Sequence, residues 1–177
     1  MNLSAWVAAY KSLPKVKCAF VTSLITFLVP AIPVTILFLS INLANDAARP
    51  ANQASIVFPS LSEALVRFAS SVIVSPLWET GVYHVALLAL LMKVISSPLK
   101  IILVSAAIFS AGHAVSNSIL SGIMTILPGI LWAYVSITWH SKTGSWKDAY
   151  TVTCLAHSLH NLYYFAGGFI PASWIVG

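Results

Sequence analysis

The sequence has 177 residues, of which 59% are hydrophobic and only 7% are charged, and its mean hydropathy is +0.91. Because charged residues make up about a quarter of an ordinary soluble domain, this composition excludes a soluble globular protein and indicates a membrane protein. The net charge of +5 comes from basic residues scattered between apolar runs, which fits residues that flank membrane spans better than a nucleic-acid-binding surface.

Five apolar segments along the chain approach or exceed the roughly 20 residues that a helical membrane span needs. They lie at about residues 18–41, 77–95, 101–120, 123–139 and 148–165. Pro30 and Pro33 are expected to kink the first span, and Pro76 is expected to break the chain before the second. Ser60 and Glu63 form a capping-box pattern, which predicts a helix that either lies at the membrane interface or continues into the bilayer. The sequence therefore predicts an all-α, polytopic transmembrane helical bundle of about five spans plus one interfacial helix.

The basic residues indicate an orientation and a division of the chain. With five spans, one side of the membrane holds Lys11, Lys15, Lys17, Lys93, Lys100, Lys142 and Lys147, and the other side holds Arg49 and Arg67. Since positively charged loops tend to remain in the cytoplasm, we expect a cytoplasmic N-terminus and an external C-terminus. We expect residues 1–60 to hold the N-terminal segment, first span and external loop, residues 61–166 to form the helical core, and residues 167–177 to form a short tail.

Glu79, inside the second span, is the most informative polar residue. An ionisable group inside a span is costly and usually faces a polar cavity with a function, although a structural glutamate near a helix end is the simpler alternative. Two further spans contribute His113, His157 and Asn161. Each of the four lies roughly 15 to 21 Å along its helix from the lysine at the helix end. We therefore expect these side chains to meet in one layer of the bundle.

Neighbouring polar residues fall around the same layer. His157 and Asn161 are four residues apart and share a helix face, and Thr80 and His84 form a second such pair. His160 lies about 60° around the helix from His157, which favours a packing role beside the site. A glutamate next to a histidine can take a proton from water, and a second histidine and an asparagine can stabilise an oxyanion. These residue types suffice for amide hydrolysis.

Four short segments also match known motifs in order. Residues 76–84 read P-L-W-E-T-G-V-Y-H, residues 109–113 read F-S-A-G-H, residues 142–146 read K-T-G-S-W, and residues 157–161 read H-S-L-H-N. They resemble the P-x-x-E-E-x-x-x-R, F-x-x-x-H, R-T-G-S-L-W and H-x-x-x-N motifs of the CPBP family, the CAAX-protease and bacteriocin-processing intramembrane proteases. Thr80 and His84 replace the second glutamate and the arginine of the first motif. This joint replacement leaves no orphan charge in the bilayer.

The resemblance implies a glutamic-type intramembrane endopeptidase whose catalytic core is residues 61–166. It implies that Glu79 is the catalytic glutamate, that His113 helps it to activate water, and that His157 and Asn161 stabilise the oxyanion. The residues expected to support them are Thr80, His84, Phe109 and His160. The implied substrate is a membrane-associated protein or peptide with a lipidated CAAX-like end, a leader or a C-terminal sorting tail, with no cofactor and no nucleic acid. The implied location is the bacterial cytoplasmic membrane, as a multi-pass protein.

Two other readings of the same residues stay open. Glu79, His113 and His157 could serve as three zinc ligands with an open fourth position, as a catalytic zinc requires, although the sequence contains no His-Glu-x-x-His helix. A non-enzymatic immunity or scaffold protein could instead keep these polar residues for helix packing.

Overall fold

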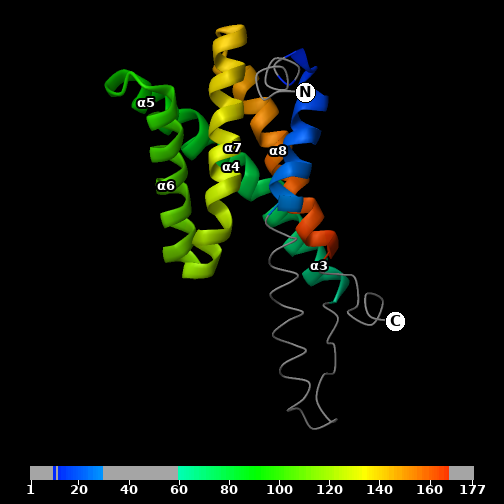
Figure 1. Cartoon of the computed structure of the whole chain (residues 1–177). Helices are drawn as coiled ribbons and strands as arrows, with labels where there is room; N and C mark the ends of the chain where they lie inside the picture. The colour runs from blue at the N-terminus through cyan, green and yellow to red at the C-terminus, as the bar shows by residue number, and fades with distance from the viewer. Residues whose placement is uncertain (1–9, 11, 30–59, 168–177) are drawn as a thin grey trace.

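The computed structural model describes residues 10, 12–29 and 60–167, which form an all-α bundle without a β-strand among them (Figure 1). A first helix covers residues 15–29. The later segments are α3 (Leu61–Phe68), the π-helix η1 (Ala69–Val74), α4 (Ser75–Gly81), the π-helix η2 (Val82–Ala86), α5 (Leu87–Val94), α6 (Pro98–Ser116), α7 (Ile119–Thr143) and α8 (Trp146–Gly167). The predicted fold class is confirmed. The kinks expected at Pro30 and Pro33 lie outside the described residues.

The segments from α3 to α5 form one continuous helix, Leu61–Val94. It begins at the predicted capping box, in which the Glu63 amide donates to Ser60 Oγ and the Ser60 amide donates to Glu63 Oε2. The expected break at Pro76 is wrong. In the wide turn just before this proline, the Ser75 amide bonds to Ser70 O, five residues back. The wider π turn tolerates a ring that would clash with the carbonyl of a regular helix.

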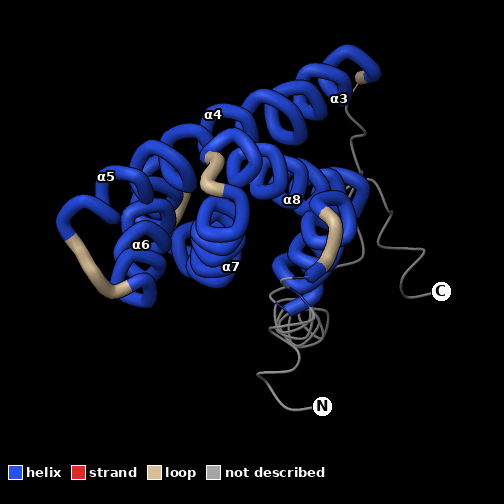
Figure 2. Tube along the Cα trace, turned by 90° about the horizontal axis from the view of Figure 1, so that it is seen from above, coloured by secondary structure: helices blue, strands red, loops and turns tan. Residues whose placement is uncertain are grey.

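This long helix contacts three other helices along its length. Its 34 residues rise about 51 Å, more than the roughly 30 Å of a bilayer core, so the predicted interfacial helix is the extension of a span. In Figure 2 it lies along one side of α6, α7 and α8. Its η1 and α4 segments contact α8, and its η2 segment contacts α6, α7 and α8. Side chains from α4 can therefore meet side chains from the other helices.

The predicted spans at residues 101–120 and 123–139 put the turn between them at Ser121 and Gly122, but the turn between α6 and α7 lies at Asn117 and Ser118. Ser118 caps α7, because its Oγ accepts from the Ser121 amide. Gly122 is inside α7, where an added Cβ would lie 2.6 Å from the Cβ of Ala114. The glycine therefore allows two helices to cross closely, and the turn is made by the capping serine.

Helices α7 and α8 run antiparallel from a turn at Gly144, which has the left-handed φ of 69° that favours glycine. The buried hydroxyls of Ser136 and Thr153 form a hydrogen bond of 2.7 Å between them. This bond sets the register in which α7 faces α8.

The two ends of the bundle differ in charge. The α5–α6 turn, the end of α7 and the start of α8 lie at the same end as the start of the helix over residues 15–29 (Figure 1). We call it the lysine end, because the described lysines there are Lys15, Lys17, Lys93, Lys100, Lys142 and Lys147. At this end Lys15 pairs with Asp148 of α8. Three of the five described helices are long and apolar enough to cross a membrane, namely Leu61–Val94, Pro98–Ser116 and Ile119–Thr143.

Candidate active site

The carboxylate of Glu79 is held by its own helix. Ser75, one turn earlier in α4, donates its hydroxyl hydrogen to Glu79 Oε1. The other oxygen, Oε2, is buried and has no hydrogen-bond partner among the described residues. The side chain as a whole is 16% exposed. One carboxylate oxygen is therefore fixed, and the other is left to face the neighbouring helices.

Two imidazoles approach that second oxygen. Nε2 of His113, near the end of α6, lies 3.7 Å from Glu79 Oε2, and Nε2 of His157, in the middle of α8, lies 3.6 Å from it. Both distances exceed those of a direct N–H···O hydrogen bond, and both suit groups that share a bridging water. Of the four residues that were expected to meet, these distances bring together Glu79, His113 and His157, which come from three helices.

The hydrogen bond of His113 indicates which of its nitrogens carries a proton. Its Nδ1 lies 3.1 Å from the carbonyl oxygen of Phe109, one turn earlier. A carbonyl oxygen only accepts, so Nδ1 is the donor. In the neutral ring Nε2 then carries a lone pair, which faces Glu79. A water molecule between the two residues can donate one hydrogen to each of them.

His157 and Asn161 are held in a different way. The His157 side chain is 3% exposed, and its Nδ1 has no hydrogen-bond partner among the described residues. Its ring stacks on the indole of Trp132, with the ring centres 3.8 Å apart. Asn161, one turn further along α8, donates its amide to the Ser71 carbonyl of η1 at 2.8 Å. One N–H of Asn161 is thus used to hold α8 against the long helix, and the amide carries a second N–H.

The sequence profile described as type II CAAX prenyl endopeptidase Rce1-like matches residues 61–163, more than half of the chain. The chain belongs to this family. The matched region contains Glu79, His113, His157 and Asn161. No curated protein and no solved structure gives a significant match. Membership in the family implies an intramembrane CAAX-type endopeptidase, and with it a membrane-associated protein substrate.

Thr80 and His84, which depart from the family's first motif, are both fully buried. The Thr80 hydroxyl oxygen and both ring nitrogens of His84 have no hydrogen-bond partner among the described residues. The His84 ring packs against Phe109 at 5.1 Å and against Trp132 at 5.7 Å. An uncharged pair suits these aromatic surroundings, in which a single buried charge would be strongly destabilising.

Phe109 and His160 pack around the site as expected. The Phe109 ring contacts His84, and it also lies 4.4 Å from the His113 ring and 6.4 Å from the His157 ring. The buried His160 shares a hydrogen bond of 2.9 Å with Thr26. Phe109 therefore packs close to three imidazole rings, and His160 joins α8 to the first helix.

Three residues that sequence reasoning missed contact the site, and they differ in how easily they could have been found. Ser75 is four residues before Glu79, and that spacing alone places it on the same helix face. No sequence spacing links Trp132 or Ser71 to the site residues. Their contacts depend on which face of α7 and of η1 packs against α8.

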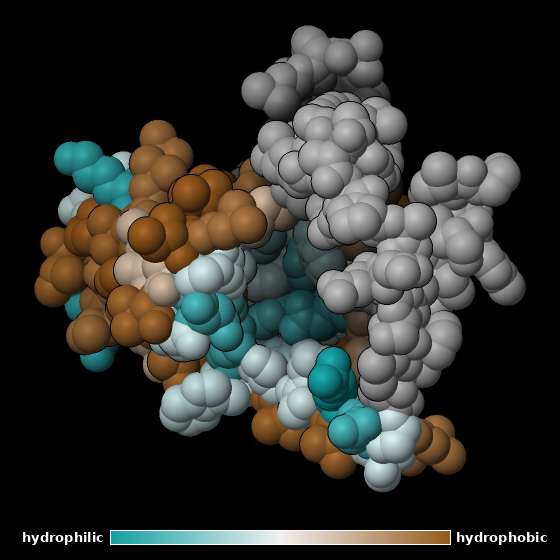
Figure 3. All heavy atoms as spheres, turned by 90° about the horizontal axis from the view of Figure 1, so that it is seen from below, coloured by the Kyte–Doolittle hydropathy of each residue, from teal (hydrophilic) through white to brown (hydrophobic). Residues whose placement is uncertain are grey.

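Figure 3 views the end of the bundle opposite the lysine end. Hydrophilic residues lie deep in the middle of this face, set back behind the more hydrophobic residues on the left. The side chains of His113 and Glu79 are 22% and 16% exposed, so that part of the site is accessible. Among the described residues, no group of three His, Cys, Asp or Glu side chains has a geometry that could hold a metal ion.

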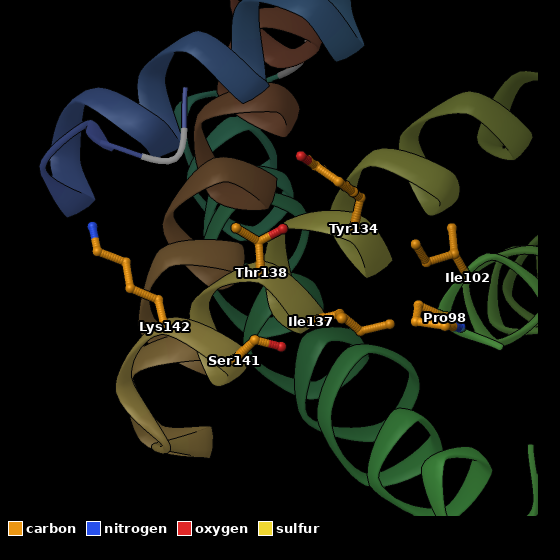
Figure 4. Close-up of a pocket in the computed structure, with 7 residues that line it drawn as sticks. All are labelled: Pro98, Ile102, Tyr134, Ile137, Thr138, Ser141 and Lys142. Atoms are coloured by element: carbon orange, nitrogen blue, oxygen red, sulfur yellow. The ribbon is translucent and has the colours of Figure 1, made fainter. Parts of the chain in front are cut away.

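A separate cavity of about 520 Å³ lies at the lysine end (Figure 4). It is lined by Pro98, Ile102, Tyr134, Ile137, Thr138, Ser141 and Lys142. The Lys142 ammonium instead lies over the Trp139 ring, 4.4 Å from its centre. None of the candidate catalytic residues lines this cavity, which is therefore separate from the chemistry.

Proposed function

We propose that this protein is a glutamic-type intramembrane endopeptidase in which Glu79 activates water. One observation carries the proposal. Glu79 Oε2 lies 3.6 and 3.7 Å from imidazole nitrogens of two other helices, and it has no other partner among the described residues. A carboxylate and a neutral imidazole at these separations can hold one water molecule between them.

In the proposed reaction Glu79 is the general base. A water molecule between Glu79 and His113 gives a proton to the carboxylate while its oxygen forms a bond to the substrate's carbonyl carbon. The second hydrogen of this water is held by His113 Nε2, whose lone pair faces it because Nδ1 donates to Phe109. When the tetrahedral intermediate collapses, the C–N bond breaks and the proton on Glu79 passes to the leaving nitrogen. One water molecule is consumed, and one carboxyl and one amine are formed.

His157 and Asn161 are proposed to stabilise the oxyanion. Nε2 of His157 lies 3.6 Å from Glu79 Oε2, and Asn161 lies one turn further along the same face of α8. The second N–H of the Asn161 amide and the Nε2–H form of His157 supply two donors. Donors fixed in place before the reaction are favourable because they need no reorganisation when charge develops.

The proposed substrate is a membrane-associated protein or peptide cleaved near a lipidated CAAX-like end, a leader or a C-terminal sorting tail. His113 lies near the end of α6 that is away from the lysine end, and its side chain is 22% exposed. By the positive-inside tendency, this arrangement supports a cytoplasmic N-terminus, an external C-terminus and a site in the outer half of a bacterial cytoplasmic membrane. A prenylated CAAX peptide, a leader peptide and a membrane-anchored sorting tail, each assayed with the protein in vesicles, distinguish the three substrate types.

The proposal is tested by Glu79→Gln, which keeps the shape of the side chain and removes the base. We expect kcat for the cleaved substrate to fall by roughly 10²- to 10⁴-fold, with unchanged insertion into the membrane. Glu63→Gln is the matched control, because Glu63 lies exposed on the same continuous helix, and a glutamine preserves the capping box. Full peptidase activity of the Glu79→Gln protein would show that Glu79 is not the base. A wild-type protein that cleaves none of the substrates, and whose cellular function survives Glu79→Gln, would support a scaffold or immunity role.

We also propose that the reaction requires no metal. The zinc alternative predicts complete inactivation by a strong chelator and recovery when zinc is added back. The glutamic mechanism predicts unchanged rates in the same titration.

A further inference from the structure

The closest ring stack around the site joins Trp132 of α7 to His157 of α8. The ring centres lie 3.8 Å apart, and the planes are inclined by 28°. Both residues are 2% exposed. Two flat rings at this distance are in van der Waals contact over their faces, so the indole limits how far the imidazole can tilt.

The two histidines beside Glu79 are therefore oriented by different means. The Nδ1 atom of His113 is tied to the Phe109 carbonyl. The Nδ1 atom of His157 has no hydrogen-bond partner among the described residues, and neither has Nε1 of Trp132. A hydrogen bond on the far nitrogen is the usual way to orient a functional imidazole. For His157 the face of the Trp132 indole orients the ring instead of a hydrogen bond.

The packing of α7 fixes the indole at this position. The Ser136–Thr153 hydrogen bond lies one turn from Trp132 along α7 and one turn from His157 along α8. On the other side, Gly129 brings α7 close to α6, where an added Cβ would lie 3.1 Å from the Phe109 ring. The stack is therefore held by contacts on both neighbouring helices.

We propose that Trp132 is the positioning residue for His157, holding the imidazole so that its Nε2 faces the reacting carbonyl. This inference rests on the proposed function, in which His157 donates to the oxyanion. The face of an indole also attracts a cation, more strongly than a phenyl ring does. Trp132 thus favours any positive charge that His157 acquires as the oxyanion forms.

The activity test uses a graded series at one position. Trp132→Leu should lower kcat by roughly 10- to 100-fold through misplacement of the imidazole, with KM within about twofold of the wild type because substrate binding is unaffected. Trp132→Phe keeps a flat ring that attracts a cation more weakly than indole does, so its kcat should lie between those of the wild type and Trp132→Leu. Trp139→Leu is the matched control, since Trp139 is a buried tryptophan of the same helix that donates to Cys18, away from the site.

The control variant should keep the wild-type kcat even if its stability falls. The proposal is overturned if Trp132→Leu keeps the wild-type kcat. It is also overturned if Trp132→Leu and Trp139→Leu lose kcat equally, because the loss then reflects general packing.

A spectroscopic test separates this inference from the proposed function. A tryptophan fixed against another ring contributes to the near-ultraviolet circular dichroism. His157→Leu should change that spectrum in the wild-type background and leave it unchanged in the Trp132→Phe background. No change in either background overturns the stack, whether or not the protein cleaves a peptide. If the stack is present and the Glu79→Gln protein retains full activity, the proposed function fails, and with it the catalytic role of the stack.

Discussion

The interior of this bundle contains two kinds of polar region. In the first kind, polar side chains of neighbouring helices form hydrogen bonds with each other. Ser136 bonds to Thr153 between α7 and α8, and Thr26 bonds to His160 between the first helix and α8. Around Glu79, by contrast, several buried polar atoms have no partner among the described residues.

Near Glu79 the unpaired atoms include Glu79 Oε2, Thr80 Oγ1, both ring nitrogens of His84 and Nδ1 of His157, and unpaired atoms also occur elsewhere, such as His140 Nδ1 at the lysine end. An unpaired buried polar group costs about 1–3 kcal/mol, so packing alone does not account for a cluster of them. The hydrogen bonds between helices hold them in register, whereas the unpaired Glu79 Oε2 is free to accept a hydrogen bond from a water molecule.

The largest expected effect is at Ser75, which holds the Glu79 carboxylate. It is the one described hydrogen-bond donor to the Glu79 carboxylate, and a hydrogen bond to a charged group is worth about 1.5–3 kcal/mol. We expect Ser75→Ala to lower kcat by roughly tenfold or more and Ser75→Thr to restore most of the loss. Ser70→Ala is the control, because in the described part of the chain the Ser70 hydroxyl bonds to the Arg67 carbonyl and not to Glu79. Equal effects of the two alanine variants would contradict this role of Ser75.

Loss of the Ser136–Thr153 hydrogen bond should lower the stability of the fold. Thr153→Val keeps the shape of the side chain and leaves the Ser136 hydroxyl without its partner. We expect unfolding in detergent to become easier by about 1 kcal/mol, with a smaller change in the Ser136→Ala/Thr153→Val double variant than in the sum of the two single variants. Strict additivity of the two losses would show that the bond does not couple the helices.

The smallest effect is expected at the lysine end. Lys15 is hydrogen-bonded to Asp148, and this holds the pKa of that carboxyl below its usual range. A lowered pKa in the folded state stabilises the fold above the ordinary pKa of aspartate, and the stabilisation is lost as the pH falls through the lowered value. Asp148→Asn should therefore lower the melting temperature slightly near neutral pH and have no effect in acid. If the melting temperatures of Asp148→Asn and the wild type still differ in acid, the Lys15–Asp148 pair is not the cause of the difference.

Hydrophobic patterning and the rise per residue were sufficient to predict the helical bundle and the layer in which Glu79, His113 and His157 meet. Both depend on distance along a helix, which a sequence determines. How each helix is rotated, and which helices it contacts, depend on packing. The predictions that failed concern these two properties. The helix continues through Pro76 because a π turn precedes it, and Trp132 reaches His157 only because α7 lies against α8.

Asn161 shows the same limit. Its predicted place, one turn along α8 from His157, follows from the spacing of four residues. Its bond to the Ser71 carbonyl does not, because that carbonyl belongs to a π segment on another helix. The proposed role of Asn161 at the oxyanion stays a prediction.

The central claim is that Glu79 and His113 act on one water molecule as a unit. A double-mutant cycle on kcat/KM tests it most directly, with Glu79→Gln, His113→Ala and the double variant assayed on the same substrate in vesicles. Residues that act as a unit are strongly non-additive, so we expect each single variant to lose nearly as much activity as the double variant. Losses that multiply in the double variant would show that the two side chains act independently, and would contradict the shared-water mechanism.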